Sequence, residues 1–313
     1  MNTRFRTRIG AGVRKTLPGL LEWRDHRRGR NATNYTEKLI YKIRYDRDPL
    51  LTVLSDKLAV RDYVAKRIGE KYLPKVYASG TIFDPEWLTG LPSKFVIKTN
   101  HGSGALIVVS DAAPANEALP ANLAQNDWST LWVRRENLDL GLVASITTQW
   151  LSQNFGRRGA HFEEWGYSQV VPRVFIEEFL EGPDGDVATD YKVWTFNGSV
   201  QAIAVIEGRF TGFRIAIMSP QWQRIPVEYN GMEFAPLDAE IPRPRNLALL
   251  LELCERIAKD LDQARIDFYD TEHGLKFGEC TNYSLGGNMI FEPASFNQFL
   301  GKDWHPDYRG KRQ

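Results

Sequence analysis

Two acidic residues near the end of the chain have the spacing of a facing pair. They lie in the two arms of a hairpin-like stretch that reads RIDFYD-TEHG-LKFGEC. An antiparallel register that pairs Asp270 with Lys276 also places Asp267 opposite Glu279. Facing carboxylates repel each other unless a cation lies between them, and their hard oxygens suit Mg²⁺. The pattern therefore predicts either a Mg²⁺ site or a surface pair in which the neighbouring Arg265 neutralises one acid.

A lysine stands at the mouth of an earlier hairpin, in the stretch SKFVIKTNHGSG that runs directly into ALIVVSD. Lys98 ends the first strand, and the loop after it offers backbone N–H groups without bulky side chains. Glycine permits the φ angles that turn successive amides into one concavity, where phosphate binds well beside an ammonium group. The spacing is neither a Walker loop nor a dinucleotide fingerprint, so an ordinary hairpin turn explains the motif equally well.

A second strand lysine, Lys192, shares a face with Asp190 and Trp194 in the segment DYKVWTF. Side chains alternate along a strand, so these three point the same way. Such a lysine is either a surface residue whose stem lies along an aromatic ring or a fixed cation directed at an anion. The residues alone leave both interpretations open.

Taken in chain order, five segments resemble the motifs of the ATP-grasp superfamily, whose members hold ATP between two antiparallel sheets. The segments are SDKLAVRDY, FVIKTNHGSG, VFIEEFL, DYKVWTFNG and RIDFYD…KFGECTN. The stretch from about residue 50 to residue 300 is most similar to the TupA-like branch, which is associated with teichuronopeptide and other bacterial surface-polysaccharide biosynthesis. The resemblance implies an α+β fold in which two antiparallel-sheet subdomains sandwich ATP, preceded by a small helical N-terminal region.

The resemblance also implies a role for individual residues, according to the part of Mg-ATP that each would contact. The implied residues are Lys57, Lys98, Gly102, Ser103 and Gly104 for the phosphate chain, Glu177, Glu178 and Leu180 for adenine, Asp184 or Asp186 for ribose, Lys192 for the γ-phosphate, Arg265 for the charge on the intermediate, and Asp267 and Glu279 for Mg²⁺. Without the resemblance, Lys57 is best explained as a solvated residue in a first helical turn, and VFIEEFL as an edge strand with exposed acids.

One position departs from the superfamily pattern. An Asn often stands two residues after the metal-binding Glu, and Thr281 occupies that place here. Asn282 comes one residue later and points away on a regular strand. Either the strand ends or bulges there and Asn282 becomes the third metal ligand, or Thr281 and water fill the place.

The implied reaction is ATP-driven ligation of a carboxylate to an amine through an acyl phosphate. The implied substrates are small molecules, such as an amino acid or amine and a uronic acid or other glycan-related carboxylate, free or linked to a sugar nucleotide. Two other functions stay open. One is a kinase that shares the nucleotide site and phosphorylates a sugar-like hydroxyl. The other is a non-catalytic glycan- or nucleic-acid-binding protein that has kept the fold.

Periodicity around the motifs predicts the elements that position them. Helical spacing of apolar residues predicts helices over 35–48 and over 55–72, the second capped by Ser55 or Asp56. Residues 127–155 are expected to form one or two helices. The apolar run NLALLLELCERIAKDL predicts a largely buried helix, and the Asn-Gly pair in TFNGSV predicts a tight hairpin turn.

Three regions are expected from the order of these elements. They are an N-terminal helical region over 1–92, a first ATP-grasp subdomain over 93–176 and a second subdomain over 177–313. The antiparallel pattern favours α+β architecture over alternating βα units.

Composition and charge exclude several classes of protein. The 313 residues are 42% hydrophobic and 25% charged, which is ordinary for a soluble globular protein. No apolar run is long enough to span a bilayer, and the first residues lack the pattern of a secretory signal. Cys254 and Cys280 lie in apolar segments, which predicts buried thiols in a reducing compartment. The expected location is the bacterial cytoplasm.

The formal net charge of +1 is unevenly spread. Residues 1–47 hold 13 Lys and Arg against four Asp and Glu. Such a segment is either a solvated arm and helix or a peripheral contact with the anionic inner-membrane surface. It has no platform of interleaved aromatic and basic residues, so no nucleic-acid partner is expected.

Overall fold

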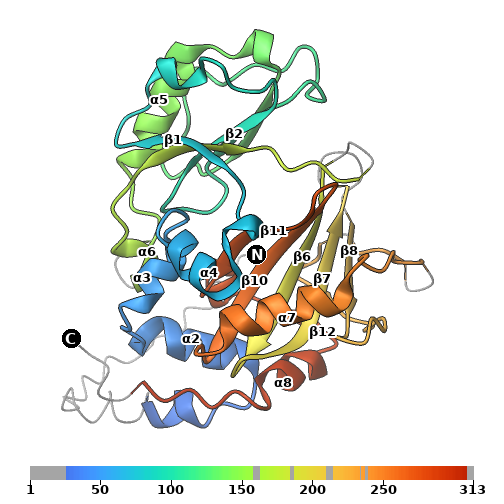
Figure 1. Ribbon diagram of the computed structural model, residues 1–313. Coiled ribbons are helices and arrows are strands. Elements are labelled where there is room, and N and C mark those ends of the chain that lie inside the picture. Colours follow the sequence, from blue (N-terminus) through green and yellow to red (C-terminus); the bar gives the residue numbers. More distant parts are fainter. Residues whose placement is uncertain are drawn as a thin grey trace, which may run out of the picture.

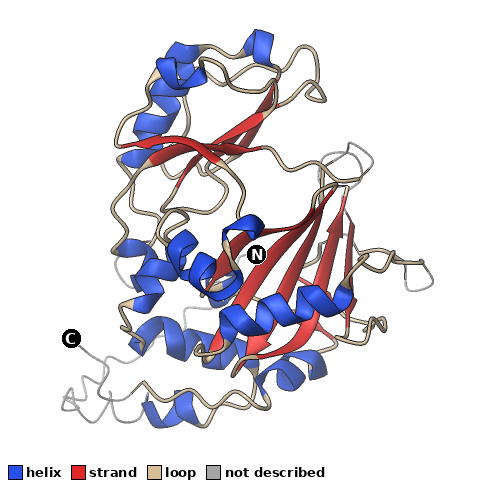
Figure 2. Cartoon of the chain, viewed as in Figure 1, coloured by secondary structure: helices blue, strands red, loops and turns tan. Residues whose placement is uncertain are grey.

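Two five-stranded sheets, one in each lobe, organise the chain (Figure 1, Figure 2). The computed structural model describes residues 26–157, 163–183, 187–208, 214–232, 234–236 and 239–308. Asp184 and Asp186, predicted for ribose, lie outside these described residues.

The first sheet presents one apolar face to a helix and one mixed face to the other lobe. Its strands, in spatial order, are β1 (Val76–Gly80), β5 (Val174–Glu178), β2 (Phe95–Thr99), β3 (Leu106–Val109) and β4 (Thr130–Val133). All neighbours pair antiparallel except β3 and β4, which are parallel. Phe95 and Ile97 pack with the buried side of α5 (Leu140–Leu151), whereas Val96 and Lys98 alternate to the opposite face.

The second sheet is antiparallel throughout. Its strands, in spatial order, are β11 (Gly274–Thr281), β10 (Gln263–Thr271), β6 (Thr189–Phe196), β7 (Ser199–Glu207) and β8 (Arg214–Met218). The predicted hairpin between β6 and β7 is confirmed. Asn197 and Gly198 form its turn with φ values of 49° and 78°, as this tight turn requires.

One face of the second sheet is covered by α4 (Val60–Ile68) and α7 (Leu247–Ala258), which crosses in front of the strands in Figure 1. The expected buried helix is confirmed on one side of α7 only. Glu252 and Arg256 form an exposed ion pair on its other side. Cys254 and Cys280 are buried free thiols, as predicted.

The opposite face of this sheet is covered at one end by short elements from both ends of the chain. These are α2 (Tyr35–Tyr45), η4 (Ser284–Gly287), α8 (Ser295–Gly301) and the two-stranded ribbon of β9 (Glu228–Tyr229) and β12 (Phe291–Glu292). Tyr35 is fully buried against Phe196 and Trp304. The helical N-terminal region is therefore part of the second lobe's core.

Two helix predictions need correction at their ends. The helix expected over 35–48 is α2, which stops at Tyr45 because the chain turns toward Pro49. The helix expected over 55–72 divides into α4 and the short η1 (Glu70–Tyr72), and it is preceded by an unexpected α3 (Leu50–Ser55). Ser55 therefore ends a helix instead of capping one. Asp56 accepts hydrogen bonds from the backbone N–H groups of the two residues that lead into α4.

The prediction of helices throughout 127–155 is wrong in its first part. Residues Thr130–Val133 form β4, followed by the short η3 (Arg135–Asn137), and only α5 is helical as expected. The remaining short helices are η2 (Pro85–Leu88) and α6 (Trp165–Ser168).

The expected region limits cut through the first sheet. β1 lies before the limit at residue 92, and β5 spans the limit between residues 176 and 177. Among the described residues no helix combines the length and apolarity needed to cross a bilayer.

A buried ion pair joins α2 to the start of β10. Lys42 is only 2% exposed, and its Nζ lies 2.5 Å from Asp262 Oδ1 and 3.3 Å from Asp46 Oδ2. The other oxygen of Asp262 accepts hydrogen bonds from the indole of Trp304 and the hydroxyl of Tyr308. Burial opposes the charge on Asp262, but Lys42 outweighs burial and lowers the pKa of this carboxyl. The network holds the C-terminal segment against α2.

Asp262→Ala leaves the buried ammonium with only its longer contact to Asp46. We expect a loss of about 2 kcal/mol in the free energy of unfolding at pH 7, below the value for a fully buried pair because Asp262 is partly exposed. Since its pKa is lowered in the fold, the difference from wild type should shrink as the pH falls below about 3.9. Urea unfolding measures both effects.

Asp260→Ala is the matched control, because Asp260 is 65% exposed in its pair with Arg67. That variant should change the free energy of unfolding by less than about 0.5 kcal/mol. Equal losses in the two variants would contradict the role given to the buried pair.

Candidate active site

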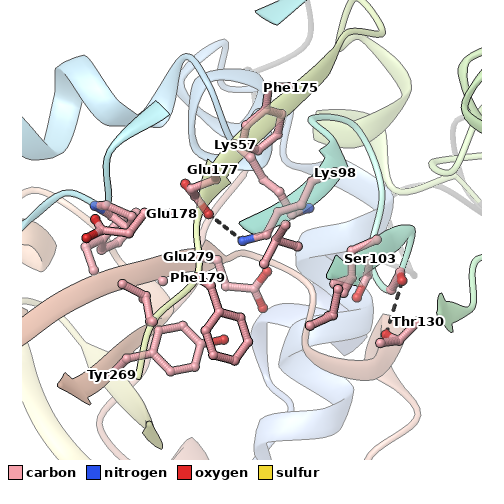
Figure 3. Close-up of a pocket in the computed structure, with 18 of the residues that line it drawn as sticks. Lys57, Lys98, Ser103, Thr130, Phe175, Glu177, Glu178, Phe179, Tyr269 and Glu279 are labelled. Carbon is pink, nitrogen blue, oxygen red and sulfur yellow. Dashed lines mark hydrogen bonds and ion pairs between the residues drawn. The ribbon is translucent and has the colours of Figure 1, made fainter. Parts of the chain in front are cut away.

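A cavity of about 360 Å³ lies between the two sheets (Figure 3). The first sheet contributes Val96, Lys98 and Glu177, and the second contributes Lys192 and Glu279. Its lining is apolar in one part and charged in another, the combination expected of a site for a ligand with an apolar ring and a charged tail.

Lys98 is held by an acid on the neighbouring strand. Its Nζ donates to Glu177 Oε2 at 2.5 Å, as Figure 3 shows. The other oxygen of Glu177 lies 3.5 Å from Arg61 on α4. The resemblance implied that Glu177 contacts adenine; its side chain borders the cavity and lies between two cations. Sequence reasoning missed Arg61, although its place four residues after Lys57 on a helical pattern put both on one face.

The expected adenine hinge is the chain that leaves β5. Glu178 and Leu180, to which the resemblance gives contacts with adenine, both line the cavity. The carboxylate of Glu178 accepts a hydrogen bond from the backbone N–H of Lys75, which ties the hinge to the approach to β1. Two aromatic residues that the sequence reasoning did not select, Phe179 and Tyr269, also line this part of the cavity.

The glycine loop lies against a tryptophan. A Cβ atom added to Gly102 would lie 2.6 Å from the ring of Trp128, and one added to Gly104 would overlap the carbonyl oxygen of Trp128. Gly104 also has a φ of 89°, which disfavours any other residue. Lys57 donates from Nζ to the carbonyl oxygen of Gly102. The structure thus places Lys57, Ser103 and Gly104 together on the cavity wall.

The acid pair on β10 and β11 faces as predicted. Asp267 pairs with Glu279 in the strand register, and Arg265 pairs with Thr281. The expected partnership of Asp270 with Lys276 is wrong. A bulge after Asp267 shifts the rest of the register by one residue.

Arg265 joins the two acids. Its Nε and Nη2 donate to Asp267 at 2.8 and 2.7 Å, and Nη2 also donates to Glu279 Oε1 at 2.8 Å and Thr281 Oγ1 at 2.9 Å. On the other side of Asp267, Lys192 Nζ lies 2.6 Å from Oδ2. The same ammonium lies 3.0 Å from Asp190, so it is a fixed cation and not a solvated surface lysine.

The two acids differ in exposure. Asp267 is 1% exposed, whereas the side chain of Glu279 is 28% exposed and borders the cavity. Burial raises the pKa of Glu279, but the charges of Arg265, Lys57 and Lys192 outweigh burial and hold this pKa well below its ordinary range. Glu279 is therefore ionised at neutral pH.

The residues present fit a Mg²⁺ ion that shares its coordination sphere with a bound nucleotide. Facing carboxylates beside a cavity supply the hard oxygens that Mg²⁺ prefers. Over the described part of the chain no cluster of three or more His, Cys, Asp or Glu side chains forms a complete metal cage. The remaining ligands would have to be phosphate oxygens and water, which is usual for Mg²⁺.

The structure does not place Asn282 with the acids, so the prediction of a third metal ligand there is corrected. Asn282 is buried, and its Nδ2 donates to the carbonyl oxygen of Leu51 and to Ser55 Oγ on α3. β11 ends at Thr281, and the alternation that brings Thr281 to Arg265 turns Asn282 to the other side.

From the sequence, Arg157, Arg158, Trp165 and Tyr167 are candidates for binding an anionic or sugar substrate. Where they are described, each already contacts another side chain. Arg157 pairs with Glu163, Trp165 lies under the guanidinium of Arg47, and Tyr167 is buried beside Phe155. Arg158 lies outside the described residues.

Comparison with protein families gives a match over most of the chain. The family described as TupA-like ATPgrasp matches residues 37–305. The chain therefore belongs to the TupA-like ATP-grasp family, which confirms the resemblance and the α+β ATP-grasp fold predicted from the motifs. The predicted enzyme class, an ATP-grasp ligase, and the predicted cofactors, ATP and Mg²⁺, are those of this family. A comparison with curated proteins finds no match.

Solved structures similar to this chain include three kinds of protein. The ATP-grasp ligase PsnB with a minimal precursor is 13% identical, with a TM-score of 0.38 over 75% of this chain and 54% of that chain. D-alanine–D-alanine ligase from Bacillus anthracis with ATP is 13% identical, with a TM-score of 0.41 over 82% of this chain and 65% of that one.

The third is the biotin carboxylase domain of Hydrogenobacter thermophilus 2-oxoglutarate carboxylase. It is 13% identical, with a TM-score of 0.39 over 82% of this chain and 46% of that chain. The chain thus spans little more than half the length of the PsnB ligase.

Gly104→Ala tests the importance of the loop's close approach to Trp128. Alanine at this φ costs about 1 kcal/mol by itself. The overlap with the Trp128 carbonyl would in addition displace the loop from the cavity, so the Kd for a non-hydrolysable Mg-ATP analogue, measured by calorimetry, should rise at least about tenfold.

Gly90→Ala provides the comparison. Gly90 has a similar φ of 74°, but a Cβ atom there meets nothing within 4 Å. The Gly90→Ala variant should lose a similar free energy of unfolding, and its Kd for the analogue should equal that of wild type. Unchanged binding by folded Gly104→Ala would show that the loop does not contact the nucleotide.

Proposed function

We propose that the protein is an ATP- and Mg²⁺-dependent ligase that joins a carboxylate to an amine. The observation that carries this proposal is the convergence of separated motifs on one cavity. Lys57 lies just before α4, Lys98 belongs to the first sheet, and Lys192 belongs to the second. All three border the same cavity as Glu279 of the second sheet. Family membership supports the same reaction class.

The reaction has two steps, and in each step negative charge develops that the cations of the cavity can stabilise. First the substrate carboxylate attacks the γ-phosphorus, and ADP leaves with the electrons of the broken P–O bond. Then the amine attacks the acyl carbon, phosphate leaves, and the amine loses a proton. Positioned cations lower the barrier to both steps because negative charge develops at predictable oxygens.

The residues divide these tasks by position. Lys57 and Lys98, on the first-sheet side, would bind the phosphate chain, and Lys192 would meet the γ-phosphate from the second sheet. Arg265 would stabilise the acyl phosphate and the oxyanion that follows. Asp267 and Glu279 would hold Mg²⁺, which screens the phosphate charges during transfer. Bound Mg²⁺ would offset part of the negative charge of the acids, and more of the positive charge of Arg265 and Lys192 would then act on the phosphates.

The chemical classes of the two substrates are a second part of this proposal. We infer a glycan-related carboxylate, such as a uronic acid, and an amino acid or other small amine, for use in bacterial surface-polysaccharide biosynthesis. The support is the similarity of the motifs to the TupA-like branch. No nucleic-acid partner is proposed.

The test is an ADP-release screen of amino acids against uronic acids and sugar nucleotides that contain them, with products identified by mass. The expected product is an amide, formed with one ADP and one phosphate per bond. Glu279→Ala should release ADP at less than about a hundredth of the wild-type rate, with little change in folding because Arg265 keeps its bonds to Asp267.

Glu272→Ala is the control for this measurement, because Glu272 is an exposed acid in the turn of the same hairpin. Its rate should match wild type. A phosphorylated sugar without an amide would instead identify a kinase, and full activity of Glu279→Ala would overturn the site assignment.

A cytoplasmic location with peripheral membrane contact is also proposed, on the strength of the basic N-terminal residues. Deletion of residues 1–25 should reduce co-sedimentation with vesicles that contain anionic lipid, by about tenfold if several cations contribute. The deletion stops there because α2 is part of the core. Neutral vesicles are the control, and unchanged binding to anionic vesicles would rule out this role.

A further inference from the structure

His101 sits in the glycine loop, yet its side chain turns away from the cavity. The imidazole is 2% exposed. Its Nε2 lies 3.1 Å from the carbonyl oxygen of Trp150 and 3.1 Å from that of Gln153, at the C-terminal end of α5. Both partners are acceptors, so Nε2 carries the hydrogen. The carbonyl oxygen of Trp150 also accepts from the backbone N–H of Gln153, and that of Gln153 lies just beyond the last turn of α5.

His101 is neutral in this setting. Burial lowers its pKa, against the opposing effect of the two carbonyl contacts. Its Nδ1 is buried and has no hydrogen-bond partner among the described residues, so a second proton would be unsatisfied. The ring also packs edge-to-face on Trp128, with centroids 5.4 Å apart. One side chain therefore connects the loop to both α5 and the tryptophan on which the glycines lie.

Asn100 anchors the loop from another direction. Its backbone N–H donates to the carbonyl oxygen of Arg173 at 3.0 Å, and its side chain bonds the backbone of Val171 and Arg173. Its carbonyl oxygen accepts from the backbone N–H of Lys57 at 3.1 Å. In contrast, Ser103 at the tip is exposed and borders the cavity. The base of the loop is thus held on several sides, and only its tip faces the ligand.

We propose that the glycine loop is a pre-formed cradle, and that His101 is the positioning residue that sets its place by donating to the end of α5. This inference rests on the proposed nucleotide site and adds what fixes its phosphate end. A swinging lid would have to break the His101 and Asn100 contacts each time it opened. The cradle needs no such step, because its contacts are made before the nucleotide arrives.

Removing the donor while keeping the volume tests this role. His101→Leu should raise the Kd for Mg-AMPPNP about tenfold, the equivalent of one buried hydrogen-bonding group left unsatisfied. His101→Gln places an amide N–H near the position of Nε2 and should return the Kd to within about threefold of wild type. A role in stability alone would lower the melting temperature of both variants without this difference in Kd at a temperature where both are folded.

His273→Leu is the matched control, since His273 is 74% exposed in the β10–β11 turn, and its Kd should equal that of wild type. If folded His101→Leu binds as wild type does, the positioning role is overturned while the proposed function stands. If wild type itself does not bind Mg-AMPPNP, the proposed function fails, and this inference fails with it.

Hydrogen exchange on the wild-type protein gives a second test that needs no variant. The amides of Thr99 and Asn100 donate to the carbonyl oxygens of Ala105 and Arg173. A pre-formed cradle predicts that these two amides exchange slowly without nucleotide and change less than about threefold when Mg-AMPPNP binds. Fast exchange that slows more than about tenfold on binding would identify a lid and overturn the proposal.

Discussion

Two carboxylates held face to face in a poorly solvated place must be balanced by positive charge, and much of the site follows from that constraint. Asp267 is almost completely buried, which raises the pKa of its carboxyl, and the bonds from Arg265 and Lys192 oppose this effect. Arg265 reaches Glu279 as well, and a single guanidinium thereby sets the spacing of the acids. Each of the two acids is thus paired with at least one cation in the absence of a ligand.

On the first sheet, too, a partly buried charge is balanced by an opposite charge. Lys98 would be costly to hold on a partly buried strand without an acid beside it, and Glu177 supplies that acid from the adjacent strand. β2 and β5 are neighbours, and Glu177 faces Val96, two residues before Lys98, so the two side chains lie diagonally on the same face of the sheet. The two sheets thus present prepositioned charges to one cavity, while their other faces are apolar and pack against α5 and α7.

Sequence patterns such as strand alternation and turn residues gave correct predictions where the feature involves only one or two neighbouring strands. The assumed antiparallel register aligned Asp267 with Glu279, although its pairing of Asp270 with Lys276 was wrong, and the Asn-Gly turn joined β6 to β7. The error at Asp270 came from a bulge at Gly278, the residue of β11 without a register partner on β10, where an added Cβ atom would lie 2.8 Å from the ring of Tyr269. A glycine inside a strand pattern is a recognised sign of a bulge, so this signal was present in the sequence.

By itself, the sequence determined on which strand face the candidate residues lie, because alternation and turn residues act over a few positions. Only the tertiary structure decided which of these residues contact one another. β4 is a strand because β3 lies beside it, Asn282 turns to α3, and His101 meets the end of α5. These contacts join segments far apart in the chain, and no local pattern encodes them, since packing and the satisfaction of buried polar groups are settled only when the whole core forms.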